Sequence, residues 1–135
     1  MDITFRRASL SMRQNMEAEL IKTFRFEAAH TLPMVPPGHK CGRMHGHSYR
    51  VDIHVTGQSD PTTGWVIDFG EIRAAVEPIL DQLDHHCLNE VPGLENSTSE
   101  NICEYLWTRL RAKLPGLSAV TLWESDTSRC VYRGA

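Results

Sequence analysis

The chain has 135 residues, of which 41% are hydrophobic and 23% are charged, and its formal net charge is −3. This length is enough for one domain with its own hydrophobic core, which we predict over residues 21–135. The charge is too balanced to indicate a nucleic-acid-binding protein, and no apolar stretch is long enough to span a membrane.

Residues 1–20 lack the apolar core of a secretory signal peptide, and we predict that they form a disordered N-terminal extension. They would also be explained by an upstream start ahead of Met12 or Met16, and their arginines and serines leave a transit peptide as an alternative. The cysteines form no C-x-x-C pair, which argues against a disulfide framework and favours a cytoplasmic location. They are Cys41, Cys87, Cys103 and Cys130.

Two strands are predicted on either side of a proline-rich loop. Residues 21–30 alternate between apolar and polar positions, and one face carries Phe24, Phe26, Ala28 and His30. Residues 45–57 alternate in the same way, and the apolar face of this second strand begins with His45 and His47. The segment between the two strands is broken by Pro33, Pro36, Pro37 and Gly38, which indicate a loop.

Two helices are predicted in the middle of the chain. A short strand at residues 65–67 precedes a capping box, Asp68 to Glu71, which opens a helix with apolar residues at helical spacing. That helix ends within residues 83–93. A second cap at residues 97–100 opens another helix, and the Pro-Gly pair at 115–116 stops it.

The C-terminal part of the chain predicts two more strands, at residues 118–124 and 130–133, around a turn. The strands and helices are therefore segregated in the order ββααββ. This order predicts an α+β fold, in which the helices cover one face of an antiparallel sheet.

Three histidines form a candidate metal site. Residues two apart on a strand project to the same side, so His45 and His47 present their imidazoles together. If the two strands pair as antiparallel neighbours, His30 joins them. Three neutral nitrogen ligands with an open fourth position are typical of catalytic zinc, although a surface or packing role is the alternative for any histidine. We interpret the other histidines of the chain in that second way, among them His39, His54 and His86.

Cys41 has two roles open to it beside these histidines. A thiolate is a good zinc ligand, and a closed site of one cysteine and three histidines would be structural. Lys40 and Arg43 are also close in sequence, and cations lower the pKa of a thiol, which suits a base or a nucleophile. The pattern leaves ligand and reagent equally open, with an inert buried cysteine as a third interpretation.

Two acidic positions add to the candidate site. Asp84 precedes His85 at the end of the first helix, where a carboxylate can orient an imidazole for proton transfer, although a histidine also suits a helix C-terminus. Glu124 ends the apolar face of its strand and could accept two parallel hydrogen bonds from an amino-pyrimidinone edge, unless it lies in solvent. Residues 97–100 need be no more than a helix cap.

Several segments together resemble the 6-pyruvoyltetrahydropterin synthase superfamily from about residue 21 to residue 134. They are FEAAH (26–30), CGRMHGH (41–47), GWVIDF (64–69), LDHHCLN (83–89), STSEN (97–101) and the closing WES…CVYRG. The spacer of three residues between Cys41 and His45 is similar to that of the branch that makes 6-carboxy-5,6,7,8-tetrahydropterin for queuosine biosynthesis. Residues 1–20, Cys87 and the turn at 126–129 depart from the pattern.

The resemblance implies a tunnelling fold, with a four-stranded antiparallel sheet and two helices, assembled into a homohexamer with active sites at the subunit interfaces. It also implies the site residues. The roles are Zn²⁺ held by His30, His45 and His47; Cys41 as the base; Asp84 and His85 as proton-relay partners from another subunit; Glu124 as the pterin anchor; and Thr98, Ser99 and Glu100 lining that pocket.

The activity that the resemblance implies is a lyase reaction on a pterin triphosphate. 7,8-Dihydroneopterin triphosphate would be converted to 6-carboxy-5,6,7,8-tetrahydropterin, with release of acetaldehyde and triphosphate. Formation of 6-pyruvoyltetrahydropterin on the same fold is the nearest alternative. A non-catalytic zinc-stabilised binding module and a cysteine hydrolase that uses Cys41 and His85 are the alternatives from other classes.

Overall fold

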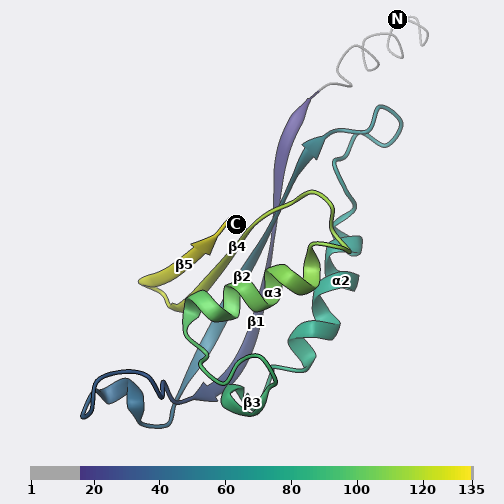
Figure 1. Ribbon diagram of the computed structural model, residues 1–135. Coiled ribbons are helices and arrows are strands. Elements are labelled where there is room, and N and C mark those ends of the chain that lie inside the picture. Colours follow the sequence, from purple (N-terminus) through teal and green to yellow (C-terminus); the bar gives the residue numbers. More distant parts are fainter. Residues whose placement is uncertain (1–15, 135) are drawn as a thin grey trace, which may run out of the picture.

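The computed structural model describes residues 16–134 (Figure 1), so the predictions for residues 1–15 lie outside the described residues. The strands are β1 (Glu17–His30), β2 (His45–Gln58), β3 (His86–Cys87), β4 (Leu117–Ser125) and β5 (Ser128–Tyr132), and the α-helices are α2 (Phe69–Asp81) and α3 (Ser99–Leu110). Two short 3₁₀ turns, Lys40–Gly42 and Leu88–Glu90, lie in the connections. The predicted α+β class and the order of the main elements are confirmed.

The sheet has five strands in the order β3-β1-β2-β4-β5, so the four-stranded prediction is wrong in this detail. The four long strands pair antiparallel as predicted. The fifth strand, β3, adds two residues at the edge, parallel to β1, where His86 and Cys87 pair with Ala28 and Ala29. Two residues are too few to show an alternating pattern, which is why the sequence did not predict this strand.

Two further predictions about strands differ from the structure. Residues 65–67 form a bend rather than a strand, because the chain folds on itself here: the Asp60 amide donates to the carbonyl of Trp65 over 2.8 Å. β1 begins at Glu17, which pairs with Gln58, so residues 17–20 are strand residues although we predicted them to belong to the N-terminal extension.

Both helices cover the same face of the sheet, as Figure 1 shows. Each helix begins at a predicted cap: the Asp68 carboxylate accepts from the Gly70 amide, and the Thr98 hydroxyl accepts from the Asn101 amide. Their apolar stripes pack on the alternating apolar side chains of the strands, with Phe26 and Tyr49 stacked at a ring-centroid distance of 4.7 Å. His30 is fully buried at the end of this core.

None of the described helices combines the length and apolar character that crossing a membrane requires.

Candidate metal centre and active site

Three imidazoles meet where β1 ends and β2 begins, as the alternating pattern predicted. His30 pairs with His45 in the antiparallel register, and Ala28 pairs with His47. The ring centroids are 4.6 Å apart for His30 and His45, 4.9 Å for His45 and His47, and 5.2 Å for His30 and His47. One ligand nitrogen from each ring lies within 4.8 Å of the others, so the three could hold a metal ion.

Hydrogen bonds orient two of these rings for a metal. Nδ1 of His30 donates to the carbonyl oxygen of Ser97 over 2.9 Å, and Nδ1 of His45 donates to the carbonyl of Arg43 over 2.7 Å. Each ring thereby keeps Nε2 as the nitrogen with a free lone pair, which is the usual arrangement behind a metal-binding histidine. Among the described residues, the buried Nε2 of His47 has no hydrogen-bond partner, which is costly for a polar atom unless a ligand occupies it. The donor set therefore fits a metal.

The local electrostatics keep the central ring neutral. Burial lowers the pKa of His30, and repulsion from His45 and His47 lowers it further. A metal ligand must be an unprotonated imidazole, so this shift favours the ligating form. Burial also raises the pKa of the neighbouring Tyr49, and the Glu124 carboxylate raises it further. The Tyr49 hydroxyl, 3.5 Å from Nε2 of His30, therefore remains protonated.

The pocket at this cluster has a volume of about 480 Å³ and is lined by residues of three segments. Cys41 lines it together with the three histidines, but within the described residues the metal-ligand group contains histidines alone. Cys41 is partly exposed and thus open to a molecule in the pocket. Glu124 lines the same pocket, and its carboxylate accepts a hydrogen bond of 2.6 Å from the Ser99 hydroxyl.

The structure separates the other residues that we predicted to line the pterin pocket. Ser99 reaches the pocket through its bond to Glu124. The Thr98 hydroxyl caps α3, and Glu100 lies exposed in the first turn of that helix. Neither Thr98 nor Glu100 lines the pocket.

Asp84 and His85 lie in the turn between α2 and β3. Nδ1 of His85 is 3.0 Å from an oxygen of Asp84, whose other oxygen accepts from the amide of Glu27 over 2.8 Å. The Glu27 amide lowers the pKa of Asp84, and His85 lowers it further, so the carboxylate stays charged. His85 has a φ of +59°, which is rare for a side chain of this size, and its amide donates to the Glu27 carbonyl. The backbone of Glu27 therefore holds both members of the pair.

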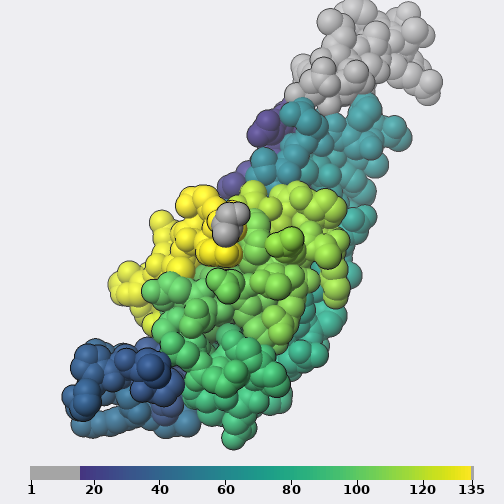
Figure 2. Space-filling model, in the orientation of Figure 1, coloured from purple at the N-terminus to yellow at the C-terminus, as the bar shows by residue number. Residues whose placement is uncertain are grey.

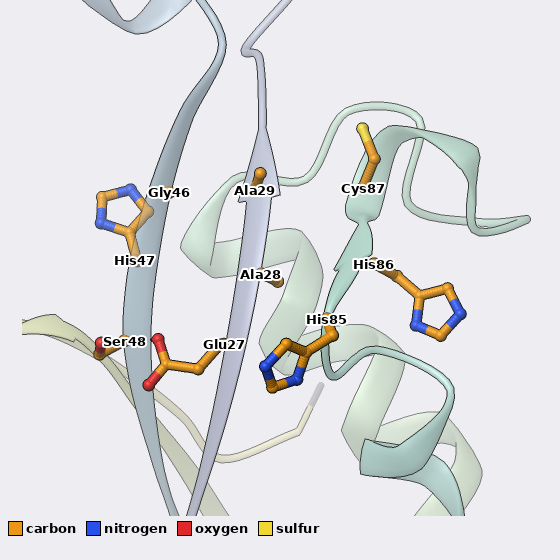
Figure 3. Close-up of a pocket in the computed structure, with 9 residues that line it drawn as sticks. All are labelled: Glu27, Ala28, Ala29, Gly46, His47, Ser48, His85, His86 and Cys87. Atoms are coloured by element: carbon orange, nitrogen blue, oxygen red, sulfur yellow. Dashed lines mark hydrogen bonds between the residues drawn. The ribbon is translucent and has the colours of Figure 1, made fainter.

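His85 lines a second pocket, of about 600 Å³, which Figure 3 shows. In this view the His85 ring lies near the side chain of Glu27, whereas the His86 ring points away. Glu27 accepts a hydrogen bond of 2.6 Å from the Ser48 hydroxyl. The pockets of Cys41 and of His85 share only Gly46 and His47. One chain by itself does not bring Cys41 and His85 into one pocket.

Two polar residues that support the cluster were missed by the sequence analysis. Ser97, read there only as part of a cap, orients His30 through its carbonyl and its hydroxyl. Asn89 fixes the segment after His30, because its side chain bonds both the amide and the carbonyl of Thr31 at 2.8 Å. Asn89 belongs to the motif LDHHCLN, but this motif does not indicate that its side chain binds Thr31.

Comparisons with known proteins find relatives that carry the names of pterin enzymes. A 6-carboxy-5,6,7,8-tetrahydropterin synthase from Synechocystis is 40% identical over 119 residues, which are 84% of this chain and 91% of that protein. A dihydroneopterin monophosphate aldolase from Pyrococcus furiosus is 32% identical over 82% of this chain and 93% of its own length. The human 6-pyruvoyl tetrahydrobiopterin synthase is 38% identical over 67% of this chain and 66% of its own length.

A solved structure and a family profile also match this chain. The 6-pyruvoyl tetrahydropterin synthase of Caenorhabditis elegans superposes with a TM-score of 0.83 at 27% identity, covering 90% of this chain and 99% of that one. The sequence profile described as 6-pyruvoyl tetrahydropterin synthase matches residues 19–135. The chain therefore belongs to the 6-pyruvoyl tetrahydropterin synthase family.

Proposed function

We propose that this chain is a zinc-dependent lyase that converts 7,8-dihydroneopterin triphosphate and water to 6-carboxy-5,6,7,8-tetrahydropterin, acetaldehyde and triphosphate, as a step towards queuosine. The observation that carries the proposal is a group of three histidines that could hold a metal ion, with the Cys41 thiol in the same pocket but outside that group. The relative from Synechocystis, a 6-carboxy-5,6,7,8-tetrahydropterin synthase that matches 84% of this chain, supports the choice of reaction.

His30, His45 and His47 would hold the metal, which the unpartnered nitrogen of His47 and the fixed tautomers of the other two support. Three imidazoles with an open position suit zinc. When bound, zinc supplies a Lewis acid for the hydroxyl oxygens of the substrate side chain.

The proton transfers are assigned to Cys41 and His85. The Cys41 thiolate would remove a proton from the substrate side chain, and His85 would return a proton to another atom of the same side chain. Asp84 would hold His85 in position and stabilise its protonated form, because its carboxylate is bonded to Nδ1 and is kept charged by the Glu27 amide. Glu124 would bind the amino-pyrimidinone edge of the pterin, next to its bond from Ser99.

This assignment requires an oligomer, because Cys41 and His85 line different pockets of one chain. We propose a homohexamer in which each active site takes Cys41 from one subunit and His85 from the next. The test is to unfold and reassemble an equal mixture of two inactive variants, Cys41→Ala and His85→Ala. Shared sites predict recovery of about one quarter of the wild-type activity, since random pairing restores both groups in a quarter of the interfaces. Sites built within one chain predict no recovery.

The reaction itself is tested by its products. Purified metal-loaded protein is incubated with 7,8-dihydroneopterin triphosphate, and both the pterin and the small product are identified by mass spectrometry. Equal amounts of acetaldehyde and the 6-carboxy pterin are expected. A 6-pyruvoyl pterin without acetaldehyde would establish the nearest alternative, and unchanged substrate would favour a non-catalytic binding module.

A further inference from the structure

Two cations line the pocket of the metal centre without an ion-pair partner. Lys40 and Arg43 are both exposed, and within residues 16–134 neither side chain forms an ion pair or a hydrogen bond. Glu124 is the one acidic residue among those that line this pocket. A pair of unengaged cations at a substrate pocket is therefore available to an anionic part of the substrate.

The backbone that carries these cations is well fixed. The Cys41 amide donates to Nδ1 of His39 over 3.0 Å, and the Arg43 amide donates to the Lys40 carbonyl over 3.1 Å. The Arg43 carbonyl accepts from Nδ1 of His45, which ties the loop directly to the metal centre. An anion bound here would order two side chains but not the loop, which keeps the entropic cost of binding low.

The opposite charges of the pocket come from different segments and, among the described residues, form no ion pair with one another. Glu124 is partly buried and bonded to Ser99 at the start of α3, whereas Lys40 and Arg43 lie on the loop of residues 31–44. Figure 2 shows this loop, in dark blue, projecting from the end of the molecule. A ligand with hydrogen-bond donors at one end and phosphates at the other matches this separation, and the reverse orientation would place phosphates against a carboxylate.

We propose that Lys40 and Arg43 form the triphosphate subsite of the pocket and thereby fix the direction in which the pterin enters. The inference rests on the proposed function, because it takes a pterin triphosphate as the ligand. Arg43 would bind phosphate oxygens in the bidentate manner of a guanidinium, and Lys40 would add a point charge. The pterin ring then lies towards Glu124, and the side-chain hydroxyls lie between the two ends, at the three histidines.

The test compares two non-reacting ligands on the metal-loaded protein: oxidised neopterin triphosphate and neopterin. The dissociation constant of neopterin is divided by that of neopterin triphosphate, both measured by pterin fluorescence. This ratio reports the affinity that the triphosphate adds. The first double variant combines Lys40→Gln with Arg43→Gln. The control double variant combines Arg111→Gln with Lys113→Gln and removes the same number of positive charges. Its two residues lie in the exposed turn after α3, at the opposite end of that helix from Ser99.

We expect the first double variant to reduce the ratio about tenfold or more and to leave neopterin affinity unchanged within about twofold. The control variant should keep the wild-type ratio. Higher salt should reduce the ratio in the wild type and leave it unchanged in the first variant. A ratio that stays at the wild-type value in the first double variant would show that Lys40 and Arg43 do not bind the triphosphate, and would overturn the proposal. Failure of the wild type to bind neopterin would refute the proposed function instead.

Discussion

Replacement of Glu124 by glutamine separates binding from folding at the proposed pterin anchor. The substitution preserves the size of the side chain and removes its charge. In the wild type the Ser99 hydroxyl donates to Glu124 over 2.6 Å, and the amide oxygen of glutamine can still accept this hydrogen bond. Since Glu124 is only partly buried, we expect the free energy of unfolding to fall by less than about 1 kcal/mol.

The effect on the ligand should be larger. A carboxylate can accept two charge-assisted hydrogen bonds from the amino-pyrimidinone edge, whereas the glutamine amide offers one acceptor and turns a donor towards the other donor of the ligand. The lost bond and the donor–donor clash together should cost about 2–3 kcal/mol, which is a loss of affinity of about 30- to 150-fold.

The assay measures neopterin affinity by fluorescence and the free energy of unfolding in urea, on the same preparation. Glu104→Gln is the matched control, because Glu104 is an exposed acid on α3 outside this pocket. An affinity for neopterin within about threefold of the control would show that Glu124 is not the anchor. A loss of stability as large as the loss of binding would show that it has a structural role.

Three other perturbations test the site and the fold. Cys41→Ala should lower kcat by about 10²–10⁴-fold while metal analysis still finds one ion per chain; loss of the metal with the thiol would make Cys41 a ligand. Removal of the metal with a chelator should abolish turnover and leave the far-UV circular dichroism unchanged, because the apolar core lies between the sheet and the helices; unfolding would instead favour a zinc-stabilised binding module. Burial alone would raise the pKa of Asp52, but hydrogen bonds from Arg50, Thr23 and Trp123 outweigh it and hold that pKa below its usual range. Asp52→Asn should therefore cost about 1–3 kcal/mol at pH 7, and the difference from wild type in urea unfolding should shrink as the pH falls through the native pKa of Asp52; a difference that persists in acid would exclude the charge as its cause.

The sequence predicted the centre of the site because strand geometry alone determines it. A period of two places His45 and His47 on one face, and antiparallel pairing with the preceding strand brings His30 to the same end. The observed register, with His30 opposite His45, is the one that this reasoning requires. The two main helices could also be predicted from the sequence, since caps and helical spacing are local signals.

The features that the sequence did not predict depend on contacts between distant segments. Ser97 orients His30 from 67 positions away, and Asn89 binds Thr31 from 58 positions away. β3 exists only because the turn at His85 brings two residues beside β1. Neither a partner that lies far along the chain nor a strand of two residues leaves a periodic pattern to be read.

The same distant contacts explain how the metal centre is kept in shape before any ion binds. His30 and His45 end and begin paired strands, where a sheet is least restrained by its own ladder. Ser97 and Asn89 supply the missing restraint, because each joins the end of β1 to the segment between α2 and α3. The segment that joins the two helices thus also sets the position of His30, and a substitution at Ser97 would remove the hydroxyl that contacts His30 without replacing any of the three histidines.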